Sequence, residues 1–316
     1  MSEAPRSYAY LGPAGTFTEA ALRQVVSPDE ATYLPMTDVV SALEAVRSGT
    51  ADFAVVPIEN SVEGGVSATL DTLAIGNQLL IVSEVVVPVD FVLAAAEPMT
   101  LKEVRRISTH PHAWAQCRRW LNTNLPDAVH VPSTSTAAAA KLLASQHPSV
   151  GFDAVLVSPL TVDLYGLHVV ADHTADNDAA VTRFVVVGQP DSVPAPTGAD
   201  KTTLLVHLPH NEAGALLTML EQFSTRGVNL SRIESRPIGD ELGRYSFSID
   251  AEGHIMDERM AAVLVGLHCT CPLVKFLGSY PRADKTQVEI REGMRNEDFV
   301  VARTWVQSLQ GRTLST

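Results

Sequence analysis

A hydroxyl and a permanent positive charge stand side by side at Thr182 and Arg183, directly before the apolar residues 184–187. A guanidinium can hold a carboxylate through two parallel hydrogen bonds, and a rigidly held hydroxyl can donate a hydrogen bond to a leaving oxygen. The pair would therefore suit a reaction in which the substrate binds through a carboxylate and loses an oxygen. Taken alone, a strand-forming threonine followed by a surface charge explains the same residues.

Four further segments place polar side chains next to apolar runs. They are residues 12–17 (GPAGTF), 57–61 (PIENS), 109–117 (THPHAWAQC) and 133–138 (STSTAA). In the first segment, Gly12 and Gly15 permit a tight turn from a strand into a helix, so that backbone amides and the Thr16 hydroxyl can face an anion. A plain turn with Thr16 as the helix cap fits the same residues.

The second and third segments carry amide, carboxylate and hydroxyl groups. Asn60 follows an apolar run and could hydrogen-bond to a substrate oxygen, while Glu59 could orient its neighbours or carry a proton. Asn-Ser after a strand is also ordinary turn chemistry. Thr109 ends another expected strand, and Gln116 follows about one turn into the next expected helix, so both side chains could reach one ligand.

In this order and spacing, and ending in Thr182-Arg183-Phe184, the segments closely resemble prephenate dehydratase. Later in the chain, residues 214–217 (GALL) and 234–237 (ESRP) resemble the ACT regulatory domain that follows the catalytic domain in that family. The resemblance covers residues 6–282. It implies decarboxylating dehydration of prephenate to phenylpyruvate in phenylalanine biosynthesis, with feedback regulation by phenylalanine.

The resemblance also assigns roles to residues. It implies a catalytic set of Thr182, Arg183, Glu59, Asn60, Thr109 and Gln116, with substrate contacts at Thr16, Ser61 and Phe184. We expect Thr182 to relay a proton to the leaving oxygen, and Arg183 to hold a carboxylate. Because formation of an aromatic ring drives the reaction, we expect no cofactor and no metal.

Two segments depart from the family's usual pattern. Thr109 and His112 stand where a serine and a glutamine are usual, and Ala179-Ala180 stands where asparagine is frequent. Threonine keeps the hydroxyl, so the binding chemistry at residue 109 is retained. A direct role for His112 is left open.

For phenylalanine, the resemblance implies a site built largely from backbone in the ACT domain. Its residues would be Gly214, Ala215, Leu216, Leu217, Asn229, Leu230, Glu234 and Ser235. The start of a helix and the start of a strand explain the same positions. Feedback would mean that the effector binds one quaternary state more tightly, and we expect a homodimer or homotetramer formed through ACT domains.

Short apolar runs alternate with helical patterns up to about residue 188, which predicts an α/β fold with parallel sheets covered by helices. Expected strands are residues 54–58, 79–87, 91–95, 106–109, 128–131, 150–156 and 181–187; expected helices are residues 16–26, 38–48, 66–75, 113–122, 136–144 and 158–165. We interpret this region as two α/β lobes, between which the chain crosses near Pro88 and returns before Phe184. The interpretation agrees with the bilobal, periplasmic-binding-protein-like architecture that the resemblance implies.

A linker at residues 189–200 separates a catalytic domain at residues 1–188 from a second domain at 201–280. Residues 188–200 hold three prolines and two glycines and lack apolar periodicity. After the linker, expected strands are residues 202–208, 229–236, 244–250 and 273–277, with helices at 214–225 and 256–267. This βαββαβ order is ferredoxin-like. The tail, residues 281–316, ends in an expected helix at 298–309.

Composition excludes several classes of protein. The 316 residues exceed what one core usually fills, and the net charge of −13 leaves no basic surface for nucleic acid. The first residues lack an apolar signal segment, and no apolar run approaches the length of a membrane span, so a cytoplasmic location is expected. Cys117, Cys269 and Cys271 fit reduced thiols.

Two groups of metal-binding residue types are not expected to bind metal. His110 and His112 lack a third ligand at suitable spacing, and Asp172, Asp176 and Asp178 lack the glycine and glutamate of an EF-hand loop. Two alternative functions stay open: the same chemistry on arogenate, and a non-catalytic, amino-acid-sensing binding protein with the same bilobal fold.

Overall fold

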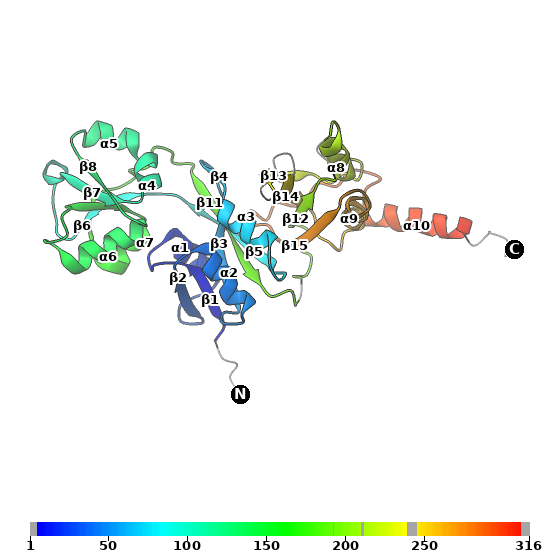
Figure 1. Ribbon diagram of the computed structural model, residues 1–316, viewed down its shortest axis with the longest axis horizontal. Helices are drawn as coiled ribbons and strands as arrows, with labels where there is room; N and C mark the ends of the chain where they lie inside the picture. Colours follow the sequence, from blue (N-terminus) through cyan, green and yellow to red (C-terminus); the bar gives the residue numbers. More distant parts are fainter. Residues whose placement is uncertain (1–4, 192, 210–211, 239–244, 311–316) are drawn as a thin grey trace. The chain divides into compact units, whose positions relative to one another are not determined.

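The computed structural model describes residues 5–191, 193–209, 212–238 and 245–310. Ser192 of the expected linker and Arg244 at an expected strand start lie outside these ranges. The chain divides into two compact units: unit 1 is Met1–Thr69 with Val85–Val187, and unit 2 is Leu70–Glu84 with Gly188–Thr316. The elements of each unit are labelled in Figure 1. None of the helices in the described ranges has the length and hydropathy that a membrane crossing requires.

The first sheet has the strand order β2-β1-β3-β11-β5, with the short β4 paired to β3. Its strands are β1 (Ser7–Leu11), β2 (Thr32–Met36), β3 (Phe53–Asn60), β4 (Gly64–Gly65), β5 (Leu80–Pro88) and β11 (Val181–Gly188), connected in part by α1 (Phe17–Val25), α2 (Val39–Arg47) and α3 (Ser67–Ala74). The return of β11 to this sheet confirms the expected position of Phe184.

The second sheet of unit 1 has the order β10-β6-β9-β7-β8. Its strands are β6 (Val92–Ala95), β7 (Arg106–Thr109), β8 (Val129–Pro132), β9 (Ala154–Val157) and β10 (His168–Ala171), with helices α4 (Pro111–Gln116), α5 (Arg118–Asn124), α6 (Thr136–Gln146) and α7 (Pro159–Tyr165) and the short 3-10 helix η1 (Leu101–Glu103). Every residue of β6 and β9 is buried, as expected for strands covered on both faces.

The prediction that the sheets are parallel is wrong, because both sheets are mixed. In the first sheet, β1 is parallel to β2 and β3, whereas β4 is antiparallel to β3. In the second sheet, β7 is parallel to β8 and β9, whereas β6 is antiparallel to β9 and β10. The chain leaves the first sheet after β5 and returns at β11, where Val181 hydrogen-bonds to Ser61 just beyond the end of β3. Because β11 reaches the first sheet from the second one, it need not run parallel to its neighbours as the strands of a βαβ unit do.

Local predictions failed at two edge strands and one helix. Strand β2 contains Pro35, which lacks a backbone donor and is tolerated at a sheet edge; β10 is the other missed strand. The expected helix at 113–122 is two helices, broken at Cys117. Asp176 caps the second of them, because its carboxylate accepts hydrogen bonds from the amides of Arg119 and Trp120.

Unit 2 contains the expected βαββαβ order. It comprises β12 (Asp200–His207), α8 (Ala215–Ser224), β13 (Leu230–Pro237), β14 (Tyr245–Glu252), α9 (Glu258–Thr270) and β15 (Leu273–Pro281). The sheet order is β13-β14-β12-β15 with antiparallel pairs, which is ferredoxin-like. Leu204, Phe223 and Val263 are among the side chains of its hydrophobic core. The tail carries α10 (Asn296–Gln310).

Residues Leu70–Glu84 pack against the sheet of unit 2. Lys201 Nζ donates to Glu84 Oε1 at 3.1 Å, and Arg236 donates to Asp71 Oδ2 at 3.0 Å. At Gly278, where φ is +133°, a Cβ atom would lie 2.2 Å from the carbonyl oxygen of Ile81. Only glycine allows this approach of the two backbones.

Candidate active site

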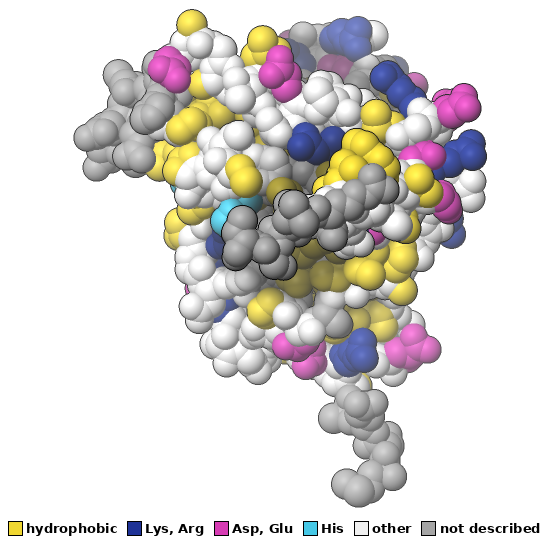
Figure 2. Space-filling model, turned by 90° about the vertical axis from the view of Figure 1, so that its right-hand side faces the viewer, with side chains coloured by type: hydrophobic (Ala, Val, Ile, Leu, Met, Phe, Trp, Pro, Cys, Tyr) yellow, Lys and Arg dark blue, Asp and Glu magenta, His cyan; other side chains and the backbone are white. Residues whose placement is uncertain are grey.

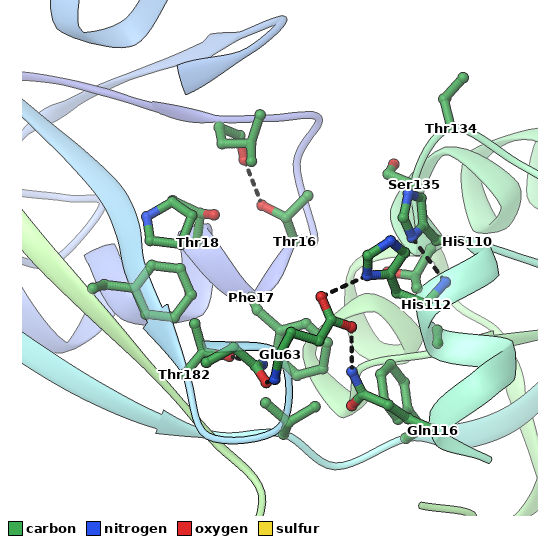
Figure 3. A pocket seen from close by; sticks show the side chains of 18 residues that line it. Thr16, Phe17, Thr18, Glu63, His110, His112, Gln116, Thr134, Ser135 and Thr182 are labelled. Atoms are coloured by element: carbon green, nitrogen blue, oxygen red, sulfur yellow. Dashed lines mark hydrogen bonds and ion pairs between the residues drawn. The ribbon is translucent and has the colours of Figure 1, made fainter. Parts of the chain in front are cut away.

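A cavity of about 290 Å³ lies in unit 1, between elements of both sheets. Figure 3 shows the 18 side chains that line it. Five of the predicted site residues are among them: Thr16, Asn60, Gln116, Thr182 and Phe184. The structure therefore brings together predicted site residues from both ends of the catalytic region, from Thr16 to Phe184.

Thr182 and Asn60 form the most specific polar contact in this cavity. Asn60 Nδ2 donates to Thr182 Oγ1 at 2.9 Å, while Asn60 Oδ1 accepts from the amides of Val62 and Glu63. Because the amide oxygen is occupied by two N–H donors, the NH2 group must be the part that faces Thr182. The threonine oxygen is thus an acceptor for Asn60, and its own proton is available for another group.

Arg183 does not line the cavity. Successive residues of a strand point to opposite faces, so Thr182 and Phe184 face the cavity and Arg183 does not. Its Nε lies 3.0 Å from Glu59 Oε2, and its side chain is 8% exposed. Glu59 also lies outside the cavity lining. Arg183 and Glu59 thus form an ion pair outside the cavity, although each directly neighbours a cavity residue in the sequence: Thr182 and Asn60, respectively.

Thr109 and Ser61 also lie outside the lining. Thr109 is fully buried, and its hydroxyl donates to the carbonyl oxygen of Leu156 at 2.7 Å, which ties β7 to β9. Ser61 Oγ accepts from the amide of Val181 at 3.0 Å. Both hydroxyls hold the strands that carry the site.

Thr16 serves as the cap of α1 and also lines the cavity. Its hydroxyl donates to the Leu11 carbonyl oxygen at 2.8 Å and accepts from the Glu19 amide. The loop before it is fixed by the second lobe, because Thr161 and Ser158 donate to the Gly15 carbonyl oxygen. Thr16 is therefore both a helix cap and a cavity residue, so the two interpretations of this segment are compatible.

The second lobe contributes the starts of α4 and α6. His110 and Ser135 are their N-cap residues, and both line the cavity with Thr134 and Thr136. His112 and Gln116 project from α4 toward Glu63, as Figure 3 shows. Glu63 Oε2 lies 2.6 Å from His112 Nδ1, and Gln116 Nε2 donates to Glu63 Oε1 at 3.3 Å.

Glu63 and Thr18 are cavity residues that sequence reasoning did not single out, and Ser135 belongs to the segment 133–138, to which no role was assigned. For Glu63, a signal was present: an asparagine after a strand predicts a turn that folds the next residues back toward its side chain. The hydrogen bond from the Glu63 amide to Asn60 Oδ1 makes that turn.

The rest of the lining is apolar and aromatic. Phe17 and Phe91 meet edge to face with ring centroids 5.5 Å apart, and Val89 and the buried Phe184 complete this wall. None of the 18 described lining residues is lysine or arginine. An anion in this cavity would therefore be bound by hydroxyls, amides, helix N-termini and histidine.

Burial lowers the pKa of His110, with a further contribution from nearby His112. His110 Nδ1 accepts a hydrogen bond from the His112 amide, which requires that nitrogen to be unprotonated. An unfolded histidine has a pKa of about 6.5. The unfolded chain therefore takes up the proton first, and folded stability is present above that pH and lost as the pH falls.

We accordingly expect the melting temperature of the wild type to be lower at pH 5.5 than at pH 7.5. This difference should be smaller in His110→Asn. Asparagine keeps an N-cap acceptor but does not titrate. Melting curves of both proteins at the two pH values test this expectation. Equal losses in both proteins would contradict it.

In the described part of the chain, no group of three or more His, Cys, Asp or Glu side chains is placed to hold a metal ion. Cys117 is a buried thiol whose pKa burial raises to about 12. This thiol is accordingly a poor nucleophile.

The residues assigned to phenylalanine are in unit 2. Gly214 is the N-cap of α8 with φ +92°, and a Cβ atom there would meet no atom within 4 Å. Leu216 and Leu217 are exposed, and Asn229 and Leu230 lie at the start of β13. Ala215, Glu234 and Ser235 are half-buried or exposed. These positions are open to solvent in the single chain.

Comparison with known proteins identifies the family. A family model described as prephenate dehydratase matches residues 8–192. Prephenate dehydratase of Amycolatopsis methanolica is 44% identical over 303 residues, which cover 96% of this chain and 97% of that protein. Prephenate dehydratase of Arthrobacter aurescens, solved in complex with L-Phe, has a TM-score of 0.91 and 51% identity and covers 96% of this chain and 99% of its own.

A more distant structure, described as GqqA, a novel type of quorum quenching acylase, has a TM-score of 0.77 and 31% identity and covers 87% of this chain and 98% of its own. The family model spans more than half of the chain, and the similarity to the Amycolatopsis and Arthrobacter proteins extends over nearly all of it. The chain belongs to the prephenate dehydratase family.

Proposed function

We propose that the chain converts prephenate to phenylpyruvate, carbon dioxide and water in phenylalanine biosynthesis. The observation that carries the proposal is the Asn60–Thr182 contact inside the cavity. It supplies a hydroxyl whose oxygen is held by an amide donor and whose proton can be donated to a leaving oxygen. Family membership supports the same reaction.

The proposed step balances without an added oxidant or reductant. The bond from the ring to the carboxylate breaks, and its electron pair forms a ring double bond as CO2 leaves. The ring C–O bond breaks at the other side of the ring, and the oxygen leaves as water after it receives a proton. Thr182 donates the hydrogen bond that stabilises the departing oxygen and relays the proton, because threonine is itself a weak acid.

We infer that backbone amides bind the substrate carboxylates. The N-termini of α1 and α6 lie at the cavity, where Thr16, Thr18, Ser135 and Thr136 line it. Helix N-termini carry partial positive charge and unpaired N–H groups, which suit carboxylates. For Arg183 we propose a positioning role through Glu59, since the ion pair fixes the strand beside Asn60 and Thr182.

The direct test is turnover of prephenate by the purified chain without any added cofactor, followed by formation of phenylpyruvate. Arogenate, assayed in parallel, tests the alternative substrate with an amino group in place of the keto group. If arogenate alone is turned over, the substrate assignment is wrong. If neither is turned over, a binding protein becomes the better interpretation.

An acylase activity like that named for GqqA finds no support in the cavity. Acyl transfer needs a nucleophile activated by an adjacent base. Among the described cavity residues, no hydroxyl hydrogen-bonds to a histidine or a carboxylate: Thr16 and Ser135 contact backbone, and Thr182 contacts Asn60.

We also propose that the ferredoxin-like part of unit 2 is an ACT domain that binds phenylalanine near Gly214 and Asn229. The Arthrobacter aurescens protein, which was solved in complex with L-Phe, supports phenylalanine as the ligand. The open N-terminus of α8 offers amides to the amino acid's carboxylate.

We expect Gly214→Val to weaken phenylalanine binding about tenfold or more in calorimetry, and to leave the KM for prephenate nearly unchanged. The added side chain would stand where the ligand approaches the backbone. Gly293→Val is a matched control, because Gly293 has φ +82° and equally open space, so it introduces similar backbone strain elsewhere. Equal weakening by both substitutions would contradict the assigned site.

We propose assembly into a homodimer or homotetramer through unit 2, and a cytoplasmic location consistent with the proposed activity. Figure 2 shows hydrophobic side chains gathered on the face of the molecule that is turned toward the viewer. Val300, Val301, Trp305, Val306 and Leu309 of α10 are all exposed. Such an apolar surface supports association between chains.

A further inference from the structure

Glu63, His112 and the predicted site residue Gln116 form a polar cluster at the cavity, and the reaction proposed above gives no role to Glu63 or His112. Glu63 lies between β3 and β4, whereas His112 and Gln116 belong to α4 of the second lobe. The carboxylate of Glu63 contacts both, at 2.6 Å from His112 Nδ1 and 3.3 Å from Gln116 Nε2. Figure 3 shows these two contacts inside the lining.

The charge of the cavity makes this cluster important. Glu63 is the only aspartate or glutamate among the 18 described lining residues, and none of them is lysine or arginine. A cavity with one carboxylate and no cation would repel an anionic substrate. A protonated imidazole beside Glu63 would remove that repulsion and add a charged donor.

Two histidines line the cavity, and their surroundings differ. His110 uses Nδ1 to accept from the His112 amide and is partly desolvated, so its neutral form is favoured. His112 directs Nδ1 at the Glu63 carboxylate, and its side chain is 61% exposed. With Nδ1–H donated to Glu63, a protonated His112 presents Nε2–H as a second donor.

We propose that His112, held by Glu63, binds a carboxylate of the substrate as a charged hydrogen-bond donor. Glu63 is then a positioning residue, which fixes the orientation of the ring by accepting its Nδ1–H. Gln116 fixes the other oxygen of Glu63. This inference rests on the proposed dehydratase function and adds a specific cation to the backbone groups named for carboxylate binding.

The test is steady-state kinetics with prephenate on the full chain and four variants. We expect His112→Gln, which keeps a donor toward Glu63 but loses the charge, to raise KM about tenfold with kcat within about twofold. His112→Arg keeps a cation and should stay near the wild-type KM. Glu63→Gln should raise KM less than His112→Gln does. The double variant Glu63→Gln/His112→Gln should keep the raised KM of His112→Gln.

His173→Asn is the matched control. His173 Nδ1 lies 3.2 Å from Asp90 Oδ2, in a similar His–carboxylate pair that does not line the cavity. Its φ of +48° is tolerated by asparagine. We expect both kinetic constants of this variant to match the wild type.

Two results would overturn the inference while the wild type turns over prephenate. One is an unchanged KM in His112→Gln. The other is a wild-type KM in the double variant, which would show that His112 only neutralises Glu63 and does not touch the substrate. Absence of turnover by the wild type itself would instead overturn the proposed function, and the inference with it.

Discussion

Thr182→Val is expected to lower kcat for prephenate by about two orders of magnitude or more, with a small change in KM. Valine keeps the shape of the side chain and removes the hydroxyl that stabilises the departing oxygen. Loss of a group that acts mainly in the transition state falls on kcat. Single-turnover and steady-state rates, with a melting curve to show that the fold is kept, measure the effect.

Thr109→Val is the matched control for this experiment. Its hydroxyl is fully buried and donates to the Leu156 carbonyl oxygen, away from the cavity lining. We expect it to lose about 1 kcal/mol of stability and to keep kcat within a few-fold. If Thr182→Val keeps near-wild-type kcat, or if Thr109→Val loses as much, the roles drawn from the structure are wrong.

The different environments of Thr182 and Arg183 could have been predicted from sequence. Both residues belong to an apolar run that predicts a strand, and neighbours on a strand face opposite sides. Once Thr182 is assigned to the cavity, Arg183 must face away, where it meets Glu59. The expectation that Thr182 and Arg183 act together on one substrate rests only on their being neighbours in the sequence. Neighbours on a strand point to opposite faces of the sheet, so they do not share a site.

The return of β11 to the first sheet was predicted, but its direction in that sheet could not have been predicted from the same pattern. Alternating strands and helices indicate an α/β fold, but the direction of a strand that returns from another sheet depends on tertiary packing. Because β11 begins beside the end of β3, Thr182 reaches Asn60 from the amino end of its strand. This arrangement differs from that of parallel α/β sheets, in which ligands bind at the carboxyl ends of the strands.

The contact between Glu63 and His112 could not have been predicted from the sequence either. The two residues are 49 positions apart and belong to different lobes. The sequence argues against a metal at His112, yet no local pattern predicts that a glutamate in a turn of the first lobe reaches this histidine. Chains with the same local motifs but other residues at these two positions would have the same predicted fold.

The second large effect is expected from Asn60→Asp, which should lower kcat about a hundredfold and also raise KM. Aspartate can still accept from the amides of Val62 and Glu63, so the turn is kept. The atom facing Thr182 becomes a carboxylate oxygen in place of an NH2 donor. The threonine proton would then be donated to the new carboxylate and not to the leaving oxygen, and a new negative charge would stand in a cavity that must accept an anion.

Asn177→Asp is the control for the added charge. Asn177 also closes a turn, since its Oδ1 accepts from the Ala179 amide, but it does not line the cavity.

The double variant of Asn60 and Thr182 tests whether the two side chains act together. If Asn60 acts by directing the Thr182 proton, its substitution has little left to remove once the hydroxyl is gone. The kcat of Asn60→Asp/Thr182→Val should therefore stay close to that of Thr182→Val, whereas losses that multiply would mean that the two side chains act independently.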